Sequence, residues 1–150
     1  LLQIATLLCH LLPRWPYSFE STYNFIVFIN LLGILLIIIG TFLAIKALLE
    51  LGSSLSPLPE PKPNEPLIIK GSYMFCRHPL YQGLIIISIG ITFFKSSFLH
   101  LLLFIILLFV LKLKARREEK SLMEIHPVYK SYMKNTPAFF SGVKFLDWRS

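Results

Sequence analysis

The segment from Tyr23 to Leu48 is the feature that most constrains the fold. It carries no charged residue before Lys46. Since an α-helix rises about 1.5 Å per residue, a run of this length crosses a hydrocarbon core of about 30 Å. Of the 150 residues, 55% are hydrophobic and only 15% are charged. Soluble domains typically have about 45–50% apolar residues and about 25% charged residues. We therefore expect a membrane protein.

Three shorter apolar runs predict the remaining membrane helices. Leu80–Phe94 and Phe98–Leu113 are separated by a Lys-Ser-Ser break, which favours two helices joined by a tight turn over one long helix. The opening stretch 1–13 is counted as a further transmembrane helix. The expected fold is therefore all-α and polytopic, with about four transmembrane helices and a juxtamembrane C-terminal helical tail.

We expect a single membrane domain over residues 1–150. Its parts are the N-terminal helices 1–50, a proline-rich loop 51–70, a motif with a helical hairpin 71–114, and a C-terminal tail 115–150. The loop has prolines at 57, 59, 61, 63 and 66. Because proline lacks a backbone N–H and fixes φ, this loop should be extended rather than helical.

The basic residues predict the orientation in the membrane. Thirteen of the fifteen lysines and arginines lie in the loop 46–78 or in the tail after residue 111. By the positive-inside rule, the loop and tail of this multi-pass protein should face the cytosol or its equivalent. The basic residues flank apolar segments, so the net charge of +7 indicates membrane contact and not a nucleic-acid partner.

Two polar clusters stand at the predicted membrane boundary. Arg77, His78 and Tyr81 surround Pro79, which suits the first turn of a helix. Glu118 and Glu119 follow the last apolar run. Ionisable groups at membrane depth are costly and usually face a cavity or a partner. Because both clusters belong to the same predicted face of the membrane, we expect them to form one pocket.

Simpler explanations exist for each cluster taken alone. Arg77 could extend to the interface beside an aromatic belt residue. Lys114 and Glu118 are four residues apart, so they could pair on a solvated helix that ends near Pro127. Single histidines at 10 and 100 are interpreted as packing or interfacial residues, and Cys9 and Cys76 as small buried hydrophobes. Four glycines should let helices approach closely: Gly33, Gly40, Gly83 and Gly90.

The motif LIIKGSYMFCRHPLYQG, followed by EEKSL and then by YKSYMKNTPAFF, resembles the isoprenylcysteine carboxyl methyltransferase family. It is also similar to the wider group of small membrane methyltransferases that includes phospholipid N-methyltransferases. The resemblance covers about residues 30 to 145, and its most specific elements are Arg-His-Pro-x-Tyr and Glu-Glu. It implies a helical membrane enzyme that uses S-adenosyl-L-methionine as its cofactor.

The resemblance also implies roles for individual residues. We assign Arg77 and Lys114 as catalytic residues, with Lys114 at the position where isoprenylcysteine enzymes hold the substrate carboxylate with an arginine. Lysine keeps the charge but loses the bidentate fork, which weakens the case for that substrate. The cofactor-binding residues are expected to be Leu67, Ile68, Tyr73, His78, Pro79, Leu80, Tyr81, Glu118 and Glu119. No metal is expected, since methyl transfer from a sulfonium is a direct displacement.

The acceptor and two alternatives stay open. The expected partners are a lipid-like substrate and membrane lipids, but the methylated group could be a prenylated cysteine carboxylate or another isoprenoid or phospholipid group. A reductase of the sterol-reductase kind, which would use NADPH, is one alternative. The other is a non-catalytic small subunit of a membrane complex. The sequence leaves the oligomeric state open.

Overall fold

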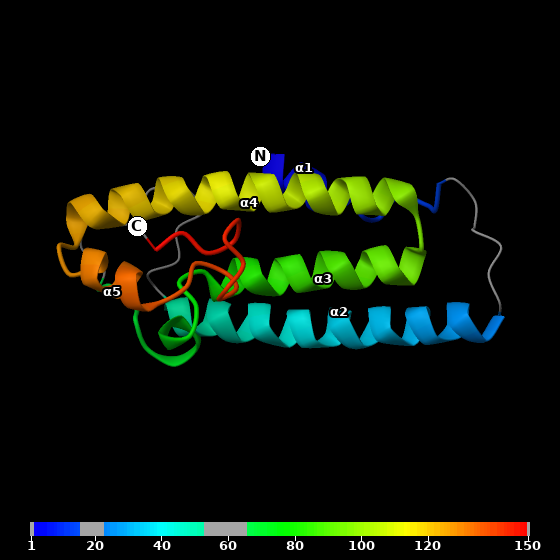
Figure 1. Cartoon of the computed structure of the whole chain (residues 1–150), viewed down its shortest axis with the longest axis horizontal. Coiled ribbons are helices and arrows are strands. Elements are labelled where there is room, and N and C mark those ends of the chain that lie inside the picture. Colours follow the sequence, from blue (N-terminus) through cyan, green and yellow to red (C-terminus); the bar gives the residue numbers. More distant parts are fainter. Residues whose placement is uncertain (1, 16–22, 53–65, 150) are drawn as a thin grey trace. The chain divides into compact units, whose positions relative to one another are not determined.

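The structure is a computed structural model and describes residues 2–15, 23–52 and 66–149. Within these ranges every regular element is helical (Figure 1). The elements in chain order are α1 (Leu2–Cys9), α2 (Tyr23–Leu51), a short 3-10 helix (Gly71–Met74), α3 (Pro79–Lys95), α4 (Phe98–Ile125) and α5 (Tyr129–Asn135). The all-α expectation is confirmed. The prolines from 57 to 63 lie outside the described residues.

Two of the described helices are long and apolar enough to cross a membrane. They are α2, over Asn24–Leu51, and α4, over Phe98–Ile125, each with 28 residues. At about 1.5 Å per residue, each exceeds a hydrocarbon core of about 30 Å. Helix α3 has 17 residues and α1 has eight. The expectation of four transmembrane helices is therefore not confirmed.

The predicted helix boundaries agree closely with the observed ones. Helix α3 begins at Pro79 and α4 begins at Phe98, so the expected break at the Lys-Ser-Ser sequence is confirmed. Ser96 in this break has a φ of 44°, which no helix interior accepts. Helix α4 ends at Ile125, as expected from the proline at position 127.

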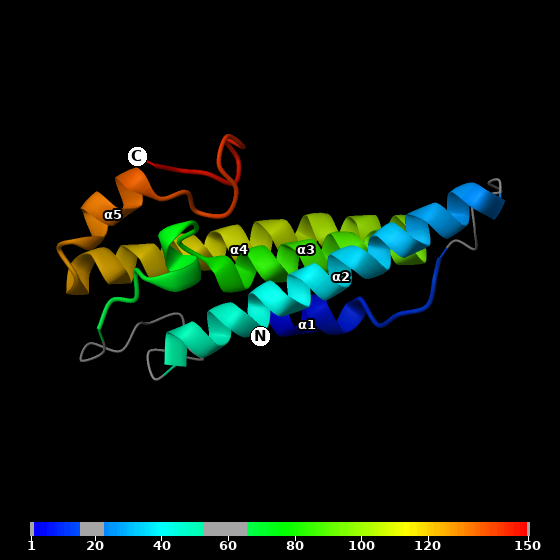
Figure 2. The same ribbon diagram turned by 90° about the horizontal axis from the view of Figure 1, so that it is seen from below.

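The chain divides into two compact units. One comprises Leu1–Phe42 with Gly83–Leu111, and the other comprises Leu43–Gln82 with Lys112–Ser150. In the first unit, α3 and α4 run side by side in both ribbon views (Figures 1 and 2). The second unit holds α5, which follows the end of α4 after a short turn (Figure 1).

Close backbone contact between α2 and α3 defines the first unit. A Cβ atom added to Gly33 would lie 2.7 Å from the Gly90 carbonyl oxygen and from the Phe94 nitrogen, and one added to Gly90 would lie 2.7 Å from the Gly33 oxygen. Gly40 approaches the Gly83 oxygen in the same way. The expected close approach of helices at these glycines is confirmed.

A buried polar chain also lies in the first unit. The His10 Nε2 atom is 2.6 Å from Ser88 Oγ, and its Nδ1 atom is 2.8 Å from the Thr6 oxygen. His100 Nε2 lies 3.3 Å from the His10 backbone oxygen. The two histidines are therefore packing residues, as expected, but they pack as members of one hydrogen-bonded set.

We predict that Gly33→Ala and Gly90→Ala each lower the unfolding temperature in detergent. An exposed helical Gly→Ala change stabilises by up to about 1 kcal/mol, but overpacking a tight contact costs about 1–3 kcal/mol. Thr41→Ala, at an exposed position of α2, is the control and should change the temperature little. An unchanged or raised unfolding temperature in both glycine variants would contradict the close contact.

Candidate functional site

The loop before α3 is tied to the end of α2. The backbone N–H of Ser72 donates to Glu50 Oε2 at 2.8 Å, and the Tyr73 hydroxyl donates to the Ala47 oxygen at 3.4 Å. Gly71 has a φ of +62°, and a Cβ there would lie 2.5 Å from the Glu50 carboxylate. The positive φ favours glycine, and a Cβ at this position would displace the Glu50 carboxylate from its place beside the loop.

The same loop is held from the other side by residues 137–139. The Arg77 N–H donates to the Pro137 oxygen at 2.9 Å, and the His78 N–H donates to the Ala138 oxygen at 3.2 Å. The Gln82 side chain donates to the Phe139 oxygen at 2.9 Å. These bonds orient the Arg-His-Pro turn independently of the contacts that its side chains make with α4.

Protein groups surround the Arg77 guanidinium. Its Nε atom is 2.9 Å from Glu119 Oε1, and neither side chain has more than 3% of its surface exposed. Its terminal nitrogens donate to the Met133 oxygen at 2.7 Å and to the Trp148 oxygen at 2.9 Å. The terminal nitrogens are thus hydrogen-bonded within the protein, whereas Nε lies close to Glu119 as an ion pair without hydrogen-bond geometry.

Glu119 is the centre of this buried cluster. Besides Arg77, it lies 3.0 Å from His78 Nε2 through Oε1 and accepts a 2.5 Å hydrogen bond from the Trp148 indole through Oε2. A buried carboxylate is tolerated only when it is paired and hydrogen-bonded. Glu119 meets this requirement with three side chains from two parts of the chain, the Arg77–His78 turn and the C-terminal segment.

Glu118 has a different environment from its neighbour. It accepts a 2.5 Å hydrogen bond from the Tyr81 hydroxyl, and its second oxygen is 3.7 Å from His78 Nδ1. Lys114 Nζ lies 3.8 Å away, and the side chains of Glu118 and Lys114 are 21% and 27% exposed. This is the edge of the cluster that is partly exposed to solvent.

Aromatic rings complete the cluster. The His78 and Tyr81 rings are stacked, with centroids 5.5 Å apart and planes 7° apart. Phe139 meets both rings edge-on and also meets the Trp148 ring at 5.3 Å. Such contacts fix ring orientation and contribute about 0.5–1.5 kcal/mol each.

Burial shifts the titration of groups around the loop. It raises the pKa of the Cys76 thiol to about 12, and the thiol donates to the Ala138 oxygen at 3.0 Å. Burial, with Glu50 nearby, also raises the pKa of Tyr73 above its usual value of 10.0. Tyr129 on α5 has its pKa raised by burial and by Glu119. All three groups therefore stay neutral at pH 7.

The structure brings together six of the residues singled out from the sequence: Arg77, His78, Tyr81, Lys114, Glu118 and Glu119. Pro79 is buried at the start of α3, and Leu80 is half-buried. Tyr73 contacts the end of α2 instead. Leu67 and Ile68 are half-buried in the extended stretch before the 3-10 helix. Among the described residues, no three His, Cys, Asp or Glu side chains are grouped as metal ligands.

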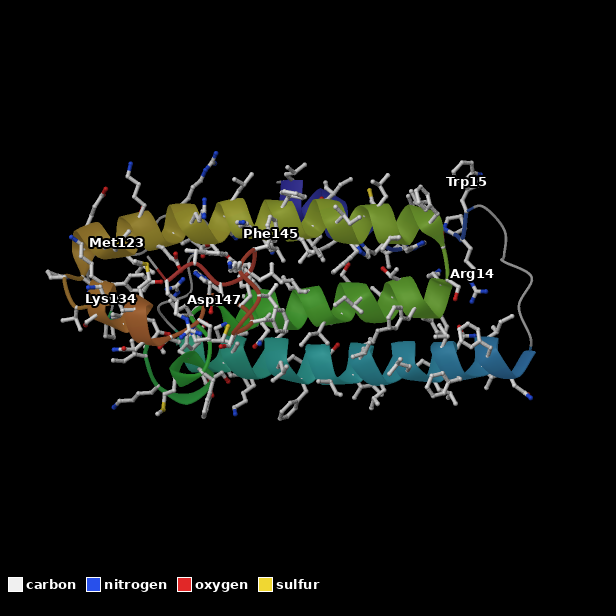
Figure 3. The ribbon with its side chains drawn as sticks, viewed as in Figure 1. Arg14, Trp15, Met123, Lys134, Phe145 and Asp147 are labelled. Carbon is white, nitrogen blue, oxygen red and sulfur yellow. The ribbon has the colours of Figure 1, made fainter. Side chains whose placement is uncertain are left out.

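Sequence reasoning missed Trp148 and Glu50. Trp148 lies in the C-terminal segment shown in Figure 3, where its neighbours Phe145 and Asp147 are labelled. It is 29 positions from Glu119, and no pattern in the sequence indicates that contact. For Glu50, the sequence did offer a signal, because it is an acidic residue in the last turn of an apolar helix and is followed by Leu51 and Gly52.

Glu119→Ala and Glu118→Ala should differ in their effect on stability. The first leaves the buried Arg77 guanidinium without its carboxylate, and breaking a buried pair costs about 3–5 kcal/mol. The second removes hydrogen bonds at a half-exposed edge, which costs about 1–2 kcal/mol. Denaturant unfolding in detergent micelles measures both losses. Equal losses would contradict the division between the two glutamates.

Cys76 should resist alkylation by a maleimide at pH 8 in the folded protein and react fully after unfolding, as mass spectrometry would show. Its pKa is raised from 9.0 to about 12, and only the thiolate is nucleophilic. The raised pKa contributes stability that is present below about pH 9 and is lost as the pH rises toward 12. Rapid modification of folded protein at pH 8 would contradict the buried thiol.

The comparison with protein families gives a clear result. Residues 28–129, about two thirds of the chain, match the family described as phospholipid methyltransferase. No curated protein matches the chain. The matched range contains the whole Arg-His-Pro-x-Tyr motif and both glutamates. The chain therefore belongs to the phospholipid methyltransferase family, a family of small membrane methyltransferases related to isoprenylcysteine carboxyl methyltransferases.

Proposed function

We propose that this protein transfers a methyl group from S-adenosylmethionine to a phospholipid or another lipid-like acceptor. Family membership implies methyl transfer to a lipid-like acceptor, and methyltransferases of this family generally use S-adenosylmethionine. The observation that carries the proposal is Glu118. Its carboxylate is held beside His78, Tyr81 and Lys114 and keeps about a fifth of its side-chain surface exposed.

The residues at this edge fit the proposed cofactor. S-adenosylmethionine has a positively charged ammonium group and a negatively charged carboxylate at its amino-acid end. Glu118 offers a partly exposed carboxylate for the ammonium group, and the partly exposed Lys114 Nζ lies 3.8 Å from that carboxylate. Glu118 can exchange Lys114 for the ammonium group of the cofactor, which leaves the Lys114 ammonium group for the acceptor.

We assign roles to the chain's own residues on this basis. Glu118 binds the cofactor ammonium group, and the stacked His78 and Tyr81 rings orient Glu118 and form one wall of the site. In this proposal, apolar contacts for the cofactor come from Leu67, Ile68, Pro79 and Leu80. Tyr73 holds the loop through its hydrogen bond to the end of α2. Arg77 and Glu119 hold the wall in place from behind, because their charged atoms have partners within the protein.

The chemistry needs positioning more than acid–base strength. When bound, the cofactor supplies an electrophilic methyl group, and the carbon–sulfur bond breaks as the acceptor's lone pair bonds to that carbon. The protein must align the acceptor and keep water out. Alignment of this kind corresponds to effective molarities of up to about 10⁵–10⁸ M.

Lys114 is assigned to the acceptor side. Its Nζ atom lies 5.3 Å from the centre of the Tyr81 ring, on a helix whose preceding residues are apolar. A phosphate or carboxylate of a lipid could pair with this ammonium group. Lysine acts as a point charge and lacks the fork that holds a carboxylate in two bonds. A phospholipid phosphate therefore suits this position better than a prenylcysteine carboxylate.

Sidedness follows from the same arrangement. Arg77, His78 and both glutamates belong to the segments 46–78 and 112–150, which hold thirteen of the fifteen basic residues. We therefore place the site in a multi-pass membrane protein on the cytosolic-equivalent side, where a water-soluble cofactor enters.

Calorimetry on detergent-solubilised protein tests the cofactor assignment. S-adenosylhomocysteine should bind the wild type, and Glu118→Gln and His78→Ala should weaken binding at least about tenfold, since a hydrogen bond to a charged group contributes about 1.5–3 kcal/mol. Glu124→Gln, at an exposed position further along α4, is the matched control and should bind normally. No binding to the wild type at millimolar ligand would refute the proposal.

Transfer of a radiolabelled methyl group identifies the acceptor in the same preparation. Label in extracted phospholipid, reduced in Lys114→Gln, is the expected result. Label only in an added prenylcysteine analogue would keep the methyltransferase but reject the phospholipid acceptor.

A further inference from the structure

We propose that Trp148 is a positioning residue, which acts on the ligand-facing edge of the site through Glu119. The inference rests on the proposed function. The inference is based on a hydrogen bond in which the Trp148 indole N–H donates to Oε2 of the buried Glu119 at 2.5 Å.

Trp148 contacts both members of the buried ion pair. Its backbone oxygen accepts a hydrogen bond from Arg77 at 2.9 Å, and its ring centre lies 5.9 Å from the Arg77 guanidinium carbon. One residue therefore holds the arginine through its carbonyl and the glutamate through its indole. The C-terminal segment is thereby fastened at the point where Arg77 and Glu119 meet.

Positive charges surround the indole ring. The Arg116 guanidinium carbon lies 5.4 Å from the ring centre and Lys112 Nζ lies 5.9 Å from it. Lys112 also lies 3.4 Å above the Phe145 ring. Cations near the face of tryptophan are attracted by its quadrupole. These contacts hold the segment against α4, as the position of Phe145 in Figure 3 illustrates.

The effect reaches the ligand side through shared partners. Glu119 Oε1 lies within 3.0 Å of Arg77 and His78, and Oε2 accepts from Trp148. With the indole in place, both carboxylate oxygens are occupied. His78 then keeps one nitrogen on Glu119, and its other nitrogen faces Glu118 at 3.7 Å. Without the indole donor, the Glu119 carboxylate can rotate, and His78 loses its fixed orientation beside Glu118.

The local fold of the segment supports a built contact. Phe139 N–H donates to the Leu146 oxygen at 3.1 Å, and Arg149 pairs with Asp147 at 2.8 Å. The Phe139 ring packs edge-on against Trp148 and against His78. The tryptophan is thus linked to the histidine by a shared ring as well as by a shared carboxylate.

The test compares Trp148→Phe with Arg149→Ala. Phenylalanine keeps a ring for Phe139 and the cations but lacks the N–H donor, whereas Arg149 is exposed and hydrogen-bonds to Asp147 and Ser141. In Trp148→Phe we expect the affinity for S-adenosylhomocysteine to fall about tenfold, and we expect it to be unchanged in Arg149→Ala. A purely structural role would instead lower the unfolding temperature and leave the affinity of the folded protein unchanged, which would overturn the proposal.

A second measurement does not depend on ligand binding. In protein labelled with ¹⁵N-histidine, the His78 signals are assigned as those lost in His78→Gln. They should shift in Trp148→Phe and stay in place in Arg149→Ala. If the wild type fails to bind while the His78 signals shift, the proposed function fails and the action of Trp148 on His78 is supported. If these signals stay in place in Trp148→Phe, the inference is wrong.

Discussion

The buried ion pair between Arg77 and Glu119 is the interaction on which the site depends. Moving two charges out of water costs several kcal/mol per ion, and only good geometry with further hydrogen bonds offsets this cost. Here the offset comes from the Met133 and Trp148 carbonyls on the arginine side, and from His78 and the Trp148 indole on the carboxylate side. The pair is therefore stable only when the loop, α4 and the C-terminal segment are all in place.

The ion pair also separates the roles of two adjacent glutamates. Successive residues of an α-helix are about 100° apart around its axis, so Glu118 and Glu119 have different surroundings and share only His78, which contacts each with a different ring nitrogen. Glu119 is 3% exposed and saturated by protein donors, whereas Glu118 is 21% exposed at the edge of the cluster. The two glutamates therefore differ in burial and in partners, and we propose that Glu118 binds the ligand while Glu119 holds the structure.

Much of this arrangement could be predicted from the sequence, because local rules govern it. The apolar run of α2, the Lys-Ser-Ser break and Pro79 determine helix positions within a few residues. The convergence of His78 with Glu118 was expected from their common side of the membrane. The contacts of Trp148 with Arg77 and Glu119 were not predictable, since they depend on how an irregular C-terminal segment folds back over a long sequence separation. The expected membrane span over 1–13 is not confirmed, because the helix described there, α1, has only eight residues.

Isotope-edited infrared spectroscopy tests the central claim, that Glu118 contacts the ligand and Glu119 does not. In protein labelled with ¹³C-glutamate, adding S-adenosylhomocysteine should shift a carboxylate band. That shift should disappear in Glu118→Gln and persist in Glu119→Gln, provided that the variant is folded. A shift that persists in Glu118→Gln and disappears in Glu119→Gln would contradict the account and would place the ligand on the buried glutamate.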